Sequence, residues 1–151
     1  MSKSRITVRI KRLPGSRELP LPAPASAGSS GVDILACVEE DIEIRPGESV
    51  LIPTGLCAQI PRGYEAQVRP RSGLALRHGI TILNSPGTID SDYRGEIGVI
   101  LINHGRDGYT IQRGDRIAQL VFSPVCEPVF EQVDDLKDTG RGSGGFGHTG
   151  I

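Results

Sequence analysis

Residues 42–69 read IEIRPGESVLIPTGLCAQIPRGYEAQVR, and this stretch decides the fold class. Four short extended segments, at 42–44, 49–53, 56–60 and 64–69, alternate with turn signals such as RPG and PRG. In the last segment Tyr64, Ala66 and Val68 share one face, because side chains on a strand alternate with a period of two. Segments this short and this closely spaced predict an all-β domain.

The same pattern continues on both sides of this stretch. At 5–11 the apolar residues Ile6, Val8 and Ile10 alternate with polar and charged ones, which predicts a half-buried strand. Further strands are expected at 32–38, 80–83, 96–103, 109–112, 116–122 and 125–133. One short helix is expected at 72–77, with Ser72 as its N-cap. Strands and helices do not alternate, so a β-sandwich or barrel is favoured over a Rossmann or P-loop domain.

Composition and charge limit the possible partners. The 151 residues have a formal net charge of −1, whereas a nucleic-acid binder that relies on counterion release is usually far more basic. No apolar run approaches the roughly 18 residues of a membrane span, and the N-terminus lacks the apolar stretch of a signal peptide. Cys37, Cys57 and Cys126 are odd in number and widely spaced, which favours reduced thiols. We therefore expect a cytoplasmic protein that binds neither nucleic acid nor membrane.

The chain changes character from Asp134 onward, where it becomes polar and then rich in glycine. Such a segment cannot pack a core of its own, so we expect a β-domain at 1–133 and a flexible tail at 134–151 that orders only with a ligand. Phe146 lies between glycines in this tail, where a ring suits stacking on a nucleobase. A plain disordered tail is the alternative.

Arg71, Ser72 and Gly73 lie in the sequence PRSGLA at 70–75, where a strand meets the short helix. Phosphate sites need backbone N–H groups, a hydroxyl and a forked cation, and this segment offers all three. An ordinary helix start after a proline is the alternative. Gln119 lies inside an otherwise apolar strand, so its amide needs either a structural partner or a ligand.

The segment NSPGTIDSDYRG at 84–95 links two apolar strands and is dense in functional side chains. Asp90 is a candidate general base, since a carboxylate is ionised at neutral pH. Tyr93 places a ring at the end of the loop, where a core aromatic is not expected. A solvated turn rich in Asp and Gly is the alternative.

Metal ligands are few in this sequence. His78, His104 and His148 have no paired spacing with cysteine, and the signature of zinc nucleobase deaminases is absent. A tightly held zinc is therefore not expected. Mg²⁺ held mainly by substrate phosphates and water would need no dedicated ligand cage.

Taken in order, five segments resemble those of the trimeric dUTPase family. They are AGSSGVDI at 27–34, PRSGL at 70–74, GTIDSDYRGE at 87–96, RGDRIAQ at 113–119 and RGSGGFGHTG at 141–150. The resemblance implies a distorted β-barrel or jelly-roll protomer and a homotrimer with three shared active sites. It also implies hydrolysis of dUTP to dUMP and pyrophosphate with Mg²⁺, which supplies dUMP for dTTP synthesis and keeps uracil out of DNA.

The resemblance further implies how the nucleoside is bound. Asp90 holds and activates the water that attacks the α-phosphorus, and it also meets the deoxyribose 3′-hydroxyl. Tyr93 packs under the sugar and leaves no room for a ribose 2′-hydroxyl. Asn84 and the hairpin groups after it, from Gly87, Thr88 and Ile89, contact the uracil edge.

The remaining contacts implied by the resemblance concern the phosphates, the metal and the tail. Asp33 orients Mg²⁺ through water. The phosphate chain and the attacking water are held by Arg71, Ser72, Gly73 and Gln119. In the tail, Phe146 stacks on uracil beside Gly147, while Arg141 and Thr149 bind the far phosphates. Two positions depart from the family pattern: Val32 replaces a residue that is often larger, and His148 replaces a frequent Ser.

Two alternatives stay open on the sequence. A dCTP deaminase, monofunctional or bifunctional, shares the fold and an Arg-Ser segment, but it typically uses Glu beside the base and lacks the Gly-Phe-Gly tail. A dUTPase-like regulator that binds nucleotide without turnover is the second. The set Asp90, Arg71, Tyr93 and Arg141 favours the enzyme.

Overall fold

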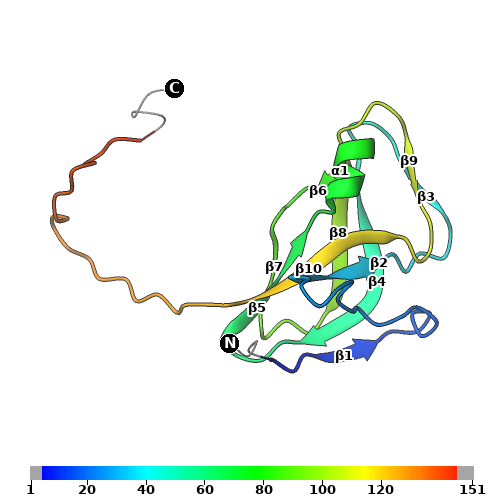
Figure 1. The fold of residues 1–151 in the computed structure, drawn as a ribbon, viewed down its shortest axis with the longest axis horizontal. Helices are drawn as coiled ribbons and strands as arrows, with labels where there is room; N and C mark the ends of the chain where they lie inside the picture. The colour runs from blue at the N-terminus through cyan, green and yellow to red at the C-terminus, as the bar shows by residue number, and fades with distance from the viewer. Residues whose placement is uncertain (1–4, 146–151) are drawn as a thin grey trace.

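The computed structural model describes residues 5–145, which form an all-β, jelly-roll-like fold with one short helix (Figure 1). This confirms the fold class expected from the sequence. In chain order the elements are β1 (Arg9–Arg12), β2 (Gly31–Leu35), β3 (Ile42–Ile44), β4 (Ser49–Gln59), β5 (Tyr64–Arg69), α1 (Ser72–His78), β6 (Ile80–Ile82), β7 (Gly87–Ile89), β8 (Glu96–Asn103), β9 (Tyr109–Ile111) and β10 (Arg116–Pro124).

These strands form two four-stranded antiparallel sheets and one two-stranded sheet. The strand orders are β1-β4-β8-β6, β2-β10-β5-β7 and β3-β9. Both larger sheets turn one face to a common core, to which Ile34 and Leu120 contribute from one sheet and Ile52 and Leu101 from the other. Among residues 5–145, no helix is long and apolar enough to span a membrane.

Strand β8 shows how the alternating sequence produces this packing. Its residues alternate between half-buried and buried positions, and the buried set ends with Asn103, which is 0% exposed. The Asn103 amide donates to the carbonyl oxygens of Ile44 and Asp107, both at 2.8 Å, and its Oδ1 accepts the Gly105 N–H at 2.8 Å. A buried polar group is tolerated because its hydrogen bonds are satisfied. Asn103 thereby ties the end of β8 to the β3–β9 sheet.

The strand predicted at 125–133 is wrong for the single chain. Beyond Pro124, residues 125–139 run away from the body as an extended arm (Figure 1). Val129 is 93% exposed and Phe130 is 92% exposed. An alternating pattern forms a strand only where a neighbour pairs with its backbone. Among the described residues, the Val125 N–H donates to the Gly63 carbonyl at 3.0 Å, but no strand pairs with the residues after it.

Four smaller predictions also needed correction. Residues 87–89, expected as loop, form β7 on the edge of β5. The segments at 49–53 and 56–60 are one strand, β4, with a register shift between Pro53 and Cys57. The N-cap of α1 is Arg71, in an extended conformation without a side-chain cap bond, so Ser72 is the first helical residue instead. The first strand is shorter than expected and begins at Arg9.

Replacing Asn103 should test the tie between β8 and the β3–β9 sheet. Asn103→Ala leaves the Gly105 N–H and two carbonyl oxygens without their partner, so we expect a loss of about 2–4 kcal/mol in unfolding free energy. Urea denaturation followed by circular dichroism measures this loss. Thr110→Ala, at an exposed position on β9, is the control and should stay within about 0.5 kcal/mol of the parent. Equal stability of the two variants would contradict the assigned role.

Candidate active site

An ion-pair cluster joins β2, β10 and the segment between β5 and α1. Arg71 Nε donates to Asp33 Oδ1 at 3.0 Å, and Arg116 Nη1 lies 3.7 Å from Asp33 Oδ2. The Asp33 side chain is only 18% exposed, so these pairs are screened less than surface pairs. We call Asp33, Arg71 and Arg116 the arginine–aspartate cluster. It concentrates two guanidinium groups around one carboxylate.

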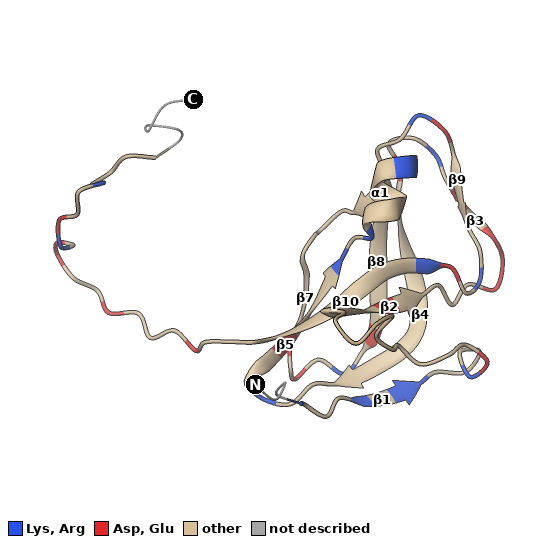
Figure 2. Cartoon of the chain, in the orientation of Figure 1, with Lys and Arg blue, Asp and Glu red and all other residues tan. Residues whose placement is uncertain are grey.

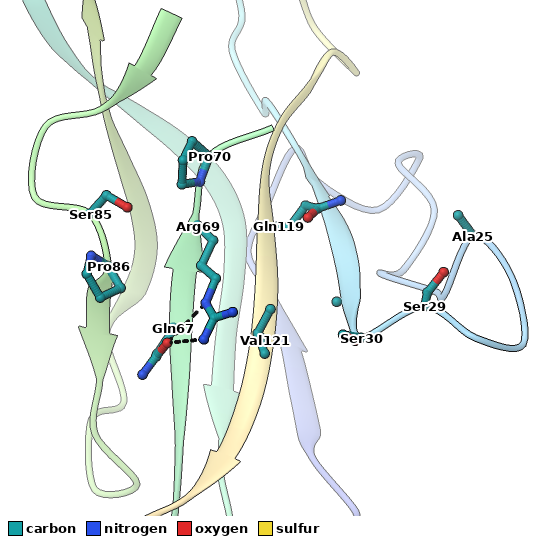
Figure 3. Close-up of a pocket in the computed structure, with 11 residues that line it drawn as sticks. Ala25, Ser29, Ser30, Gln67, Arg69, Pro70, Ser85, Pro86, Gln119 and Val121 are labelled. Atoms are coloured by element: carbon teal, nitrogen blue, oxygen red, sulfur yellow. Dashed lines mark hydrogen bonds between the residues drawn. The ribbon is translucent and has the colours of Figure 1, made fainter. Parts of the chain in front are cut away.

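Gln119 stands next to this cluster, because it pairs with Asp33 across β10 and β2 and with Arg69 across β10 and β5. It lines a cavity of about 550 Å³ together with Ser29, Ser30 and Gly31 (Figure 3). Arg69 projects from β5 into the same cavity, held by two hydrogen bonds to Gln67. The fold thus brings the segments at 27–34, 70–74 and 113–119 to one end of one sheet.

Ser72 and Gly73 open α1 and are both exposed, so their hydroxyl and backbone groups face outward. The far end of this helix packs through His78 on Tyr109, with ring centroids 4.7 Å apart. Burial and the Asp115 carboxylate raise the pKa of Tyr109, and the positive charge of Arg71 partly offsets this rise. The helix therefore rests on the β3–β9 sheet while its first turn stays open to a ligand.

A second cluster lies on the segment between β7 and β8. Thr88, Ile89, Asp90 and Tyr93 line a cavity of about 190 Å³, which also touches the first residues of β8. We call this cavity the hairpin pocket. Asn84 lies just before it: a Cβ on Gly87 would stand 3.2 Å from Asn84 Nδ2, so this amide packs over the Gly87 backbone. Carboxylate, amide, ring and backbone groups are thereby gathered at one place.

The two clusters do not meet within one chain. Ile89 pairs with Ala66, so Asp90 lies level with Glu65, whereas Gln119 pairs with Arg69 at the other end of β5. Four residues along a strand correspond to about 13 Å. A water activated by Asp90 could not attack a phosphorus held at Gln119 of the same chain.

The other predicted site residues lie in or near the tail. Arg141 is exposed, and its guanidinium donates to the Gly144 carbonyl at 2.7 Å within a local turn. Phe146, Gly147 and Thr149 lie outside the described residues. No three His, Cys, Asp or Glu side chains gather as a metal site in the described 5–145 segment. The three cysteines are free thiols.

Sequence reasoning missed three residues that the fold places at these clusters. Arg69 and Arg116 flank Gln119 and Asp33, and Glu96 lines the hairpin pocket. Arg69 and Arg116 are charged residues at the ends of strands, which was a weak signal. Glu96 ends the family-like segment at 87–96, but that resemblance assigned it no role.

Comparisons with known proteins agree with this geometry. The family model described as dUTPase matches residues 17–150. A deoxyuridine 5′-triphosphate nucleotidohydrolase from Methylocella silvestris is 56% identical over 147 residues, which cover 96% of this chain and 92% of the relative.

Solved structures give the same result. The dUTPase of Staphylococcus bacteriophage 80alpha, solved with dUPNHPP, superposes with a TM-score of 0.85 at 26% identity, over 96% of this chain and 99% of that chain. A mutant dUTPase from phage phi11 of S. aureus, described with a structural Mg(II) ion, superposes with a TM-score of 0.77 at 25% identity, over 86% of this chain and 98% of that chain.

This all-β fold superposes on that of solved dUTPases, which are nucleoside triphosphate hydrolases. The chain belongs to the dUTPase family, as the family match and the 56% identical relative show. Its activity is the hydrolysis of dUTP to dUMP and pyrophosphate. Neither the deaminase nor the non-catalytic regulator is favoured by these findings.

Proposed function

We propose that the hairpin pocket binds the deoxyuridine part of dUTP. The proposal rests above all on the cavity that Asp90 and Tyr93 share with Thr88 and Ile89. An edge of uracil needs both donors and acceptors, which the hairpin backbone and the Asn84 amide supply. The Tyr93 ring would pack under the sugar and leave no space for a ribose 2′-hydroxyl.

In this arrangement Asp90 acts as the general base. Its carboxylate accepts a proton from the attacking water while the water oxygen bonds to the α-phosphorus and pyrophosphate leaves. Asp90 is exposed at the mouth of the hairpin pocket, where water has access. Closure of the site then excludes other water and strengthens each charge interaction.

The phosphate chain is proposed to lie on Arg71, Ser72, Gly73 and Gln119. A guanidinium binds phosphate oxygens in a forked geometry, and the exposed first turn of α1 offers a hydroxyl and backbone N–H groups. The Arg71–Asp33 pair keeps that guanidinium oriented before substrate arrives. Charge developing on the pyrophosphate then meets donors that are already in place.

We also propose Mg²⁺ as the cofactor, because the phage phi11 relative is described with a Mg(II) ion. Each Asp33 carboxylate oxygen faces a guanidinium, at 3.0 Å and 3.7 Å, so a contact through water fits Asp33 better than direct ligation. A cation that keeps most of its water and binds phosphate oxygens needs no further protein ligands. Bound there, Mg²⁺ would neutralise phosphate charge.

The separation of the two clusters supports a homotrimer with shared sites. Since Asp90 and Gln119 stand about 13 Å apart along β5, a complete site needs the hairpin pocket of one chain and the arginine–aspartate cluster of another. The phosphate groups of one copy then face the deoxyuridine pocket of its neighbour. Three copies around an axis would close three such sites.

The outer face of the β1-β4-β8-β6 sheet supports the same conclusion. Leu51 is 61% exposed opposite the half-buried Ile100, and Leu83 is 54% exposed nearby. Ile102 continues this row opposite Thr81. A sheet face that meets water is normally polar, so a contiguous apolar face marks a protein interface.

The arm adds a second unpartnered surface. Its exposed apolar residues include Val129, Phe130 and Leu136. Acidic residues lie before, between and after them along the arm (Figure 2): Glu127, Glu131, Asp134, Asp135 and Asp138. An extended segment of this kind buries its apolar side chains when it packs on a neighbouring copy. The tail proposed at 134–151 overlaps the end of this arm; in it, Phe146 would stack on uracil beside Gly147, with Arg141 and Thr149 on the far phosphates.

The base is tested by Asp90→Asn. This change keeps the shape of the side chain but removes its basicity, so turnover of dUTP should fall by on the order of 10²-fold or more. Binding of a non-hydrolysable dUTP analogue, measured by calorimetry, should be nearly retained. A separate assay of the parent protein uses all common nucleoside triphosphates with Mg²⁺ and measures both pyrophosphate and ammonia. Release of pyrophosphate without ammonia from dCTP distinguishes the pyrophosphatase from a deaminase. Near-normal turnover by the Asn variant would rule out Asp90 as the base.

Assembly is tested by Leu51→Lys, which places a charge on the apolar face of the sheet. Sedimentation of the parent should give about three times 16.1 kDa, whereas the variant should dissociate and lose activity. Thr110→Lys, at an exposed site on β9, is the control and should change neither mass nor turnover. A parent protein that is monomeric under assay conditions would refute the shared site.

The tail is tested by deleting residues 140–151. Fixing a glycine-rich backbone costs much conformational entropy, so the contacts of this segment should act in closure rather than in folding. The thermal midpoint and the oligomeric state should stay nearly unchanged, while turnover falls at least ~10-fold, as expected from the loss of one stacked ring. Phe146→Trp should keep most activity and report closure by fluorescence, because the chain has no Trp. Unfolding or dissociation of the truncated protein would instead make the segment structural.

A further inference from the structure

The Tyr93 ring is held against the backbone of the two residues that follow Arg94. Its hydroxyl donates to the Glu96 carbonyl oxygen at 3.0 Å. A Cβ on Gly95 would lie 2.4 Å from the Tyr93 hydroxyl oxygen and 2.6 Å from Cζ. The ring therefore occupies space that only a glycine leaves open, and its tip is tied to the first residue of β8.

Glu96 is in turn anchored through its side chain. Glu96 Oε1 accepts the backbone N–H of Gly55 at 2.8 Å, across a sequence separation of 41 residues. Gly55 lies where the pairing of β4 with β8 shifts register, between Pro53 and Cys57. The N–H groups at such a shift lack ladder partners, and Gly55 is buried. Glu96 thus supplies an acceptor that the sheet itself cannot provide.

The register shift is a firm anchor because other contacts fix it. Thr54 is buried, and its hydroxyl donates to the Ile97 carbonyl at 2.6 Å. The Gly55 carbonyl accepts from the Leu13 N–H at 2.8 Å and from the Ser16 hydroxyl at 2.9 Å. Gly55 has φ +68°, and a Cβ there would meet Ser16 Cβ at 2.3 Å. The acceptor for Tyr93 is therefore tied to the body of the domain.

We propose that Glu96 is a positioning residue for sugar discrimination, acting through Tyr93. Its carboxylate on the Gly55 N–H fixes the start of β8, and this fixes the carbonyl that holds the Tyr93 hydroxyl. Glu96 and Tyr93 both line the hairpin pocket, so a displacement of Glu96 changes the position of Tyr93 there. The inference rests on the proposed role of Tyr93 in excluding a ribose 2′-hydroxyl.

The test measures the ratio of kcat/KM for dUTP to kcat/KM for UTP. Glu96→Ala removes the acceptor, so this ratio should fall at least ~5-fold, the change expected for one lost hydrogen bond of ordinary strength. Glu96→Gln keeps an oxygen for the Gly55 N–H and should stay within about 2-fold of the parent. Tyr93→Phe breaks the same link from the other side and should lower the ratio in the same direction. The double variant Glu96→Ala/Tyr93→Phe should lower the ratio little further than either single variant does.

Glu48→Ala is the matched control, because Glu48 also accepts a backbone N–H, that of Arg45 at 3.2 Å, but just before the start of β4 and away from the register shift at Gly55. Its ratio should equal that of the parent, and thermal midpoints are recorded for all variants. If Glu96→Ala does not fold, Tyr93→Phe decides. Suppose that Tyr93→Ala lowers the ratio but Tyr93→Phe, or a folded Glu96→Ala, leaves it unchanged. That result overturns the role of Glu96 and leaves the proposed role of Tyr93 standing. An unchanged ratio in Tyr93→Ala overturns the proposed role of Tyr93 itself.

Discussion

The pairing of β5 with β10 on one side and β7 on the other governs where each functional group can stand. Gln119 is level with Arg69 at one end of β5, and Ile89 is level with Ala66 toward the other. Because side-chain positions on a paired strand repeat at fixed spacing, this register sets the distance between Gln119, proposed to hold phosphate, and Asp90, the proposed base. On the shared-site proposal, the geometry of catalysis therefore depends on contacts between chains.

Alternation in the sequence predicted most of the sheet. Segments such as 64–69 and 96–103 have a clear period of two, and both form strands as expected. Each of these strands is paired with another strand on both sides. The segment at 125–133 has a similar pattern but lacks a partner, and it stays extended and exposed. For residues 87–89 the prediction was wrong in the opposite direction: a loop was expected, but they pair with the edge of β5 as β7. Three residues in a polar segment are too few to show a period of two.

The candidate site was predictable in its parts but not in its arrangement. Asp90 and Tyr93 lie three residues apart, so the sequence could place them together in one loop. The ion pair between Asp33 and Arg71 joins residues 38 positions apart, and no local pattern contains that contact. Glu96 is the clearest case: its partner Gly55 depends on a register shift within β4, which only the folded chain defines.

The distance between the two clusters on one chain also has a genetic consequence. On the shared-site proposal, each site takes its base from one protomer and its phosphate groups from another. A defect in the hairpin pocket and a defect in the arginine–aspartate cluster would then fall in different sites when two mutant chains assemble together. A mixed assembly would contain some sites with both lesions and some with neither. Two alleles that are each inactive could therefore complement one another within a single cell.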